Sequence, residues 1–172
     1  LIVVDNIAKL YAMDIKTGEL LWSKNNSAHF NSQVKIYKDK FFAIDFENIL
    51  RCYSIKDGTE LWQVKTDQSL IKSQKKLSLV ILDNNVYFNN SIGDVSAVDI
   101  ASGDLLWQTP TQSSGIYEEA FFLKTSDLIA NNNSIFFSNN KNEFFGVDEK
   151  NWLIKWKQTL NSNLRPTFAD GF

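Results

Sequence analysis

The amino-acid sequence predicts an all-β fold made of four consecutive antiparallel units, and three observations support this. A segment ending in tryptophan occurs four times, as LYAMDIKTGELLW, LRCYSIKDGTELW, VSAVDIASGDLLW and FFGVDEKNWLIKW. The tryptophans are 40, 45 and 49 residues apart (62−22, 107−62 and 156−107). Short strand-like runs separated by Gly, Asn and Asp turn signals precede each segment. Repeats of about 40 to 50 residues with strand content are typical of the four-stranded blades of a β-propeller.

Each unit is expected to be one blade of hairpin-connected strands. The blades are placed approximately at residues 1–25, 33–66, 77–110 and 127–160. The clearest pattern is in the second, with strands predicted at 33–37, 41–45, 50–55 and 60–65. The third is expected to have strands at 77–82, 86–89, 95–100 and 104–109, and the fourth at 127–130, 135–138, 143–148 and 153–158. The first blade lacks its innermost strand, and the segment 164–172 resembles an isolated strand that could complete it.

Four blades would form half of an eight-bladed ring. Such a half-ring would leave the apolar faces of its first and last blades in water, which is unfavourable. Two copies of the chain are therefore expected to associate as a homodimer that completes a propeller ring.

The repeated residues are predicted to dock neighbouring blades. The wedges between blades are expected to be Trp22, Trp62, Trp107 and Trp156. The turn before the outer strand carries a glycine, where positive φ is easily adopted, in Gly18, Gly58 and Gly103. Asp14 and Asp99 are expected to accept N–H bonds in those turns. Opposite the tryptophans, small residues are expected to leave room for the indole rings: Ala12, Cys52, Ala97 and Gly146. In the fourth repeat Trp152 replaces the glycine, and the turn is expected to shift toward Asn151.

The composition and the motifs of the chain argue against several classes of function. A formal net charge of −2 and a pI near 5.4 argue against a nucleic-acid surface, which requires clustered Lys and Arg. No apolar run reaches the roughly 20 residues of a transmembrane helix. Cys52 is the only cysteine, so the chain can form no internal disulfide. The sequence shows no phosphate-binding loop, no Ser/His/Asp pattern and no metal-ligand spacing of Cys or His. No catalytic, cofactor-binding or metal-binding residue is therefore expected.

Two long connections are candidate partner-binding loops, because long loops on a rigid scaffold often carry binding residues. The connection at 67–76 contains Leu70, Ile71 and Lys72. The connection at 110–124 contains the aromatic and aliphatic residues Ile116, Tyr117, Phe121 and Phe122. The alternatives are a solvated lysine cluster in the first loop and a pair of phenylalanines packed on the propeller in the second.

The segment Ala12–Trp22 reads A-x-D-x-x-T-G-x-x-x-W, and it resembles the PQQ-type, or tryptophan-docking, propeller repeat. Among proteins with this repeat, the chain is most similar to the BamB-like outer-membrane assembly lipoproteins. The resemblance implies a non-enzymatic protein-binding scaffold that assists outer-membrane β-barrel assembly. Its implied partners are the β-barrel insertase or client strands. The implied location is the bacterial periplasm, peripheral to the outer membrane at most, with no cofactor.

The same repeat leaves two other functions open. PQQ-dependent quinoprotein dehydrogenases use adjacent cysteines and a Ca²⁺ site, and Cys52 has no neighbouring cysteine. The second alternative is the luminal sensor propeller of a stress kinase. The repeat predicts the fold but does not choose among these functions.

Overall fold

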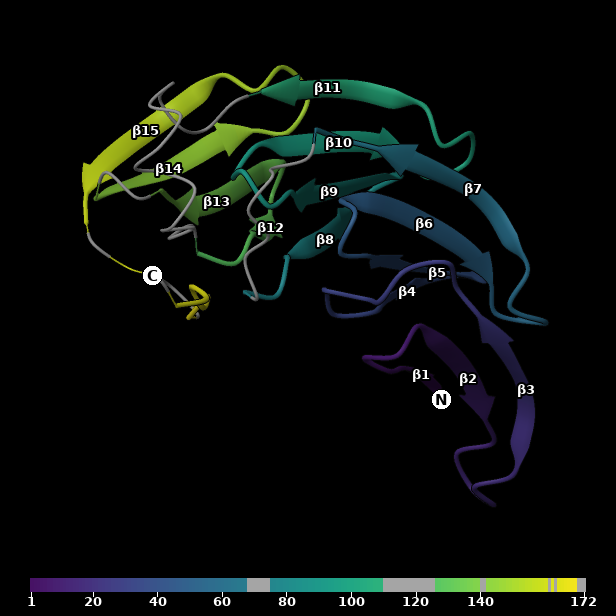
Figure 1. The fold of residues 1–172 in the computed structure, drawn as a ribbon. Coiled ribbons are helices and arrows are strands. Elements are labelled where there is room, and N and C mark those ends of the chain that lie inside the picture. The colour runs from purple at the N-terminus through teal and green to yellow at the C-terminus, as the bar shows by residue number, and fades with distance from the viewer. Residues whose placement is uncertain (68–74, 110–125, 140–141, 161, 163, 170–172) are drawn as a thin grey trace.

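The computed structural model of the chain describes residues 1–67, 75–109, 126–139, 142–160, 162 and 164–169 (Figure 1). In these residues the regular secondary structure consists of fifteen β-strands. They form four antiparallel sheets, each made of strands that follow one another in the chain. The predicted all-β class and the four-unit organisation are confirmed.

Three of the four sheets have four strands. The second sheet contains β4 (Lys35–Tyr37), β5 (Lys40–Ile44), β6 (Ile49–Ser54) and β7 (Glu60–Lys65). The third contains β8 (Leu79–Leu82), β9 (Asn85–Asn89), β10 (Val95–Asp99) and β11 (Leu105–Thr109). The fourth contains β12 (Ile129–Asn131), β13 (Ser134–Ser138), β14 (Glu143–Asp148) and β15 (Ile154–Thr159).

The first sheet has three strands: β1 (Ile2–Val4), β2 (Lys9–Met13) and β3 (Leu20–Asn25). Ile2 pairs with Ala12 as Phe42 pairs with Cys52, so β1 occupies the second position of a blade and the innermost position is vacant. Residues 164–169, the described part of the segment expected to fill that position, form no strand. The strand that precedes this segment, β15 (Ile154–Thr159), lies at the opposite end of the arc of sheets from β1 (Figure 1).

Every sheet has a register shift at one equivalent position between its third-position and outer strands. The shifts fall at Ala12/Met13, Cys52/Tyr53, Ala97/Val98 and Gly146/Val147. In each case the first residue of the pair lies opposite the repeated tryptophan. Such bulges increase the local twist of a strand pair. The small residue, the bulge and the tryptophan therefore form one structural unit.

The hydrophobic core is divided among the three gaps between successive sheets. The largest cluster, between the second and third sheets, is built around Phe42, Leu50, Val86 and Phe88. A second cluster lies between the third and fourth sheets and a third between the first and second. The sheets therefore pack face to face along an arc, with the N-terminal and C-terminal sheets at its two ends (Figure 1).

Candidate functional site: the interfaces between sheets

The first two interfaces use the same tryptophan contact. Trp22 of β3 donates its indole N–H to the carbonyl oxygen of Ile55 in the second sheet at 3.0 Å. Trp62 of β7 donates to the carbonyl of Ile100 in the third sheet at 3.2 Å. Each indole thus satisfies its only donor on the next sheet while its ring fills the gap, as buried tryptophans generally do.

The turn glycines are the surfaces against which these rings lie. Gly58 and Gly103 have φ values of +68° and +79°. A Cβ built on Gly58 would lie 2.6 Å from the Trp22 ring, and one on Gly103 would lie 2.7 Å from Trp62. Both positions thus need glycine for backbone conformation and for close approach.

The third interface replaces glycine with a second tryptophan. Trp152 has φ of +58°, and its N–H bonds to the Asp148 carbonyl at 3.1 Å. Gly103 makes the equivalent bond to Asp99. The expected shift of the turn toward Asn151 is therefore wrong. Left-handed backbone in a residue with a Cβ costs about 1–2 kcal/mol. Ring contacts offset this strain, because Trp152 lies 4.3 Å from Trp107 and 5.6 Å from Phe137 between ring centroids.

At the ends of the arc, the tryptophan and the turn glycine each lack the partner that they have at the internal interfaces of the described structure. Trp156 of β15 has no further sheet beside it in the described structure and is 42% exposed. Its ring lies over Gly146 and near Phe136 and Phe144 of its own sheet. At the other end, a Cβ built on Gly18 would meet nothing within 4 Å. The expectation that Trp156 docks between blades stays a prediction, because no sheet follows β15 in the described residues.

Carboxylates close the turns beside the glycines. Asp14 accepts N–H bonds from Lys16 at 2.8 Å and Thr17 at 2.9 Å. Asp99 accepts N–H bonds from Ala101 and Ser102, both at 2.8 Å. The Thr17 and Lys16 amides lower the pKa of Asp14, and the Ser102 amide makes the largest contribution to lowering the pKa of Asp99. These bonds favour the ionised carboxylates.

The turn carboxylates predict a loss of stability in acid. A folded-state pKa below the unfolded value of about 3.9 contributes stability above that value, which is lost as pH falls through the folded pKa. The melting temperature should therefore fall below about pH 4. In the double variant Asp14→Asn and Asp99→Asn, the side chains still accept N–H bonds but do not titrate. Thermal unfolding between about pH 2 and 6 should show a shallower decline for this variant. Parallel curves for the two proteins would contradict the assignment.

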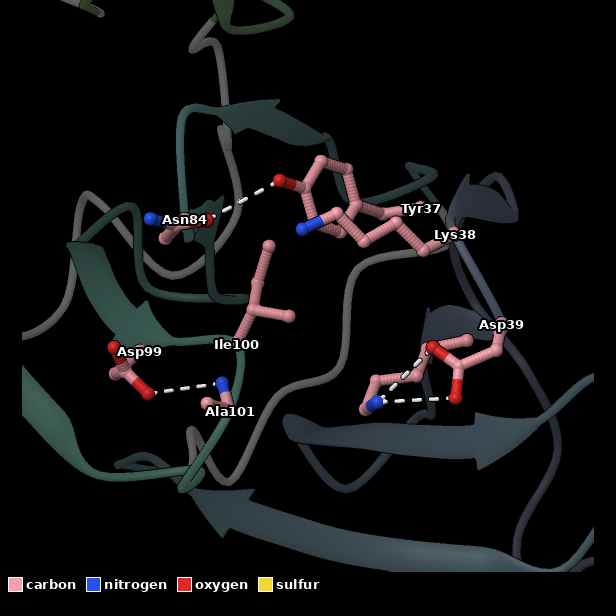
Figure 2. A pocket seen from close by; sticks show the side chains of 8 residues that line it. Tyr37, Lys38, Asp39, Asn84, Asp99, Ile100 and Ala101 are labelled. Carbon is pink, nitrogen blue, oxygen red and sulfur yellow. Dashed lines mark hydrogen bonds and ion pairs between the residues drawn. The ribbon is translucent and has the colours of Figure 1, made fainter.

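A cleft of about 320 Å³ lies beside the second interface. Figure 2 shows Ile100 of the third sheet pointing into it, with Tyr37 and Asp39 on the second-sheet side. The Tyr37 hydroxyl donates to Asn84 Oδ1 at 3.2 Å across the cleft, and Lys40 pairs with Asp39 at 3.1 Å. The Tyr37–Asn84 hydrogen bond therefore links the second and third sheets across this cleft.

A buried arginine network, absent from the sequence-based predictions, joins the first two sheets. The side chains of Arg51 and Asp45 are 7% and 0% exposed, and Arg51 Nε lies 2.8 Å from Asp45 Oδ2. Arg51 also pairs with Glu60 at 2.8 Å and donates to Ser27, in the connection from the first sheet, at 3.1 Å. All of these contacts satisfy a guanidinium that could not otherwise be buried without a large penalty.

The sequence does contain a signal for the turn between β5 and β6, in which Asp45 lies. Asp45 accepts N–H bonds from Glu47 and Ile49. Equivalent side-chain oxygens accept turn N–H bonds at Asp5, Asn90 and Asn139. Each of the four precedes its tryptophan by 17 residues (22−5, 62−45, 107−90 and 156−139). The constant spacing marks a second repeated turn position.

The predicted partner-binding residues lie outside the described structure. These are Leu70, Ile71, Lys72, Ile116, Tyr117, Phe121 and Phe122. Cys52 is described, and it is buried, which raises the pKa of its thiol to about 12. Within the described ranges, no three His, Cys, Asp or Glu side chains are grouped as metal ligands. No helix formed by those residues has the length and apolarity to cross a bilayer.

Sequential antiparallel sheets docked by tryptophan on a neighbouring turn define a β-propeller with PQQ-type repeats. The chain belongs to the family described as outer membrane protein assembly factor BamB, whose model matches residues 1–172. The BamB of Shewanella oneidensis is 25% identical over 101 residues, which cover 58% of this chain and 25% of the relative. The recognised resemblance to BamB-like proteins is thereby confirmed.

Solved structures show the same fold. BamB from Moraxella catarrhalis superposes with a TM-score of 0.80 at 18% identity, covering 95% of this chain and 50% of that one. A europium-containing methanol dehydrogenase superposes with a TM-score of 0.76 at 12% identity, covering 94% of this chain and 40% of that one. The chain thus spans half or less of the length of each of these three proteins.

Proposed function

We propose that the chain is part of a non-catalytic propeller scaffold that binds a protein partner during outer-membrane β-barrel assembly. The observation that carries the proposal is the family match along all 172 residues. The assembly role in the name of the Shewanella oneidensis relative supports it. The periplasm, at the outer membrane, is the location that agrees with this role.

Anchored ends of the first candidate loop support a binding role for that loop. Before the loop, the Asp67 carbonyl accepts a bond from the Asn48 side chain at 2.8 Å. After it, the Lys75 carbonyl accepts a bond from the Asn31 side chain at 3.2 Å. Asn48 and Asn31 are themselves buried. A scaffold that fixes both ends of a loop lowers the entropy lost when the loop binds.

The first sheet offers a second mode of binding. Among the described residues β1 has no inner neighbour, and we propose that an extended segment of a partner pairs with this edge. Client outer-membrane proteins consist largely of strands, and strand addition to an open sheet edge is a common mode of peptide recognition. We include client strands among the proposed partners for this reason.

A binding assay with the purified periplasmic domains of a bacterial outer-membrane insertase tests the proposal. We expect saturable binding that weakens at least about tenfold in the double variant Leu70→Asp and Ile71→Asp, because buried apolar anchors dominate such contacts. The control is Leu21→Asp on β3, which is 63% exposed and outside the proposed loops. It should bind as the unmodified chain does.

Two outcomes would overturn the proposal. One is an absence of saturable binding by the folded chain. The other is binding of pyrroloquinoline quinone with Ca²⁺, measured by calorimetry on the same preparation, which would indicate a dehydrogenase fragment. Far-ultraviolet circular dichroism of every variant separates lost binding from lost folding.

A further inference from the structure

We propose that a cleft between the first and second sheets binds the carboxylate of an acidic side chain of a protein partner, through Lys24 and Arg51. The cleft has a volume of about 380 Å³ and is lined by residues of β2, β3 and β6, by the connection after β3 and by the turn before β7. The inference goes beyond the proposed function and does not depend on it, because no residue of the two candidate loops lines this cleft.

The cleft carries polar side chains at positions that are mostly apolar at the other two interfaces. In this cleft the four positions are occupied by Lys24, Arg51, Tyr53 and Glu60. The strand registers place at the same positions of the second interface Val64, Ser96, Val98 and Leu105. At the third interface the last three positions are occupied by Phe145, Val147 and Ile154. Apolar residues thus suffice there, and a buried ion pair rarely stabilises a fold more than apolar packing does. We therefore assign the polar groups to binding.

The Arg51 guanidinium has one N–H group left for a ligand. A guanidinium carries five N–H donors. Four of them are used within the chain, by Nε to Asp45, by Nη1 to Glu60 and Gln63, and by Nη2 to Ser27. The second N–H of Nη2 has no acceptor among the described residues. Because the side chain is 7% exposed and lines the cleft, an acceptor reaches this N–H through the cleft.

Lys24 adds a second donor from the first sheet. Its side chain is exposed, and its ammonium makes no hydrogen bond or ion pair within the described part of the chain. The cleft is thus lined by two cations, Lys24 and Arg51, and by one carboxylate, Glu60, which already accepts from Arg51. A ligand carboxylate has two oxygens to offer these two donors, and charge-assisted hydrogen bonds are about twice as strong as neutral ones. An acidic side chain therefore matches the donors better than a neutral amide does.

A nuclear magnetic resonance titration of the isotope-labelled chain with two capped tripeptides provides the test. The probe is acetyl-Gly-Glu-Gly-amide, and its neutral control is acetyl-Gly-Gln-Gly-amide. We expect the glutamate peptide to shift the backbone amide resonances of Ser27 and Glu60, which line the cleft. It should bind at least about tenfold more tightly than the glutamine peptide. Raising the ionic strength from about 0.1 M to about 1 M should weaken its binding, because the screening length falls from about 10 Å to about 3 Å.

Lysine variants distinguish this cleft from a general attraction of the peptide to the chain. Lys24→Gln should weaken binding of the glutamate peptide about fivefold, and Lys24→Arg, which keeps the charge, should retain it. The matched control is Lys16→Gln, at an exposed lysine of the first sheet outside the cleft, which should bind as the unmodified chain does. Circular dichroism checks that each variant is folded. The proposal is wrong if the glutamate peptide shifts no cleft resonance up to about 10 mM. It is also wrong if both peptides bind equally, or if Lys16→Gln loses as much affinity as Lys24→Gln.

Discussion

Replacing Gly103 with alanine is expected to destabilise the chain by about 2–5 kcal/mol. This loss is expected to be larger than that of the same substitution at Gly18. The left-handed backbone accounts for about 1–2 kcal/mol of this. A Cβ only 2.7 Å from Trp62 adds an overlap that the packed interface cannot relieve without moving the indole. Such overpacking typically adds about 1–3 kcal/mol.

Gly18→Ala is the matched control, because φ at Gly18 is +74° and no atom lies within 4 Å of the added carbon. Its loss should be confined to the backbone contribution of about 1–2 kcal/mol. Urea denaturation gives both values if the protein is dilute enough to be monomeric. Equal losses for the two variants would show that the tryptophan contact does not constrain the glycine.

Asp45→Ala is expected to cost about 3–5 kcal/mol, because it leaves the buried Arg51 without its buried carboxylate partner. The two side chains are 2.8 Å apart and almost completely buried, and Glu60, the other ion-pair partner of Arg51, is more exposed. A loss of this size is a large part of the total stability of an ordinary domain, about 5–15 kcal/mol.

Two further variants distinguish the contribution of the Asp45–Arg51 ion pair to stability from that of the turn hydrogen bonds. Asp45→Asn keeps an acceptor for the turn amides, as Asn90 does in the third sheet. Its loss should therefore be smaller than that of Asp45→Ala. Asp5→Ala removes the equivalent turn residue of the first sheet, which accepts N–H bonds from Ile7 and Lys9 and has no arginine partner. If Asp5→Ala were as destabilising as Asp45→Ala in urea denaturation, the ion pair would not be the source of the effect.

The strands were predictable because their signals are local. Turn residues and alternating apolar runs placed the strands of the second sheet within about two residues of their observed ends. The repeat supplied the number of units and the vacant innermost position of the first sheet. These features depend on residues close together in sequence, where turn chemistry and strand preference act directly.

Features that depend on distant residues were missed or misjudged. Local preference favoured Asn151 for the left-handed position, but stacking on Trp107 and Phe137 places Trp152 there. The buried position of Arg51 depends on Ser27, 24 residues earlier, as well as on Asp45. The acceptor for the Trp22 indole is 33 residues away, on the next sheet. No pattern within a single repeat specifies such partners.

The constant 17-residue interval between each turn Asp or Asn and its tryptophan has a consequence for how this chain can diversify. All variation in repeat length falls between a tryptophan and the next such residue, in intervals of 23, 28 and 32 residues (45−22, 90−62 and 139−107). The invariant stretch contains the bulge, the glycine turn and the docking indole. Mutation can therefore lengthen or re-compose the intervening stretches while the framework remains intact, so that new recognition properties can evolve without the architecture being rebuilt.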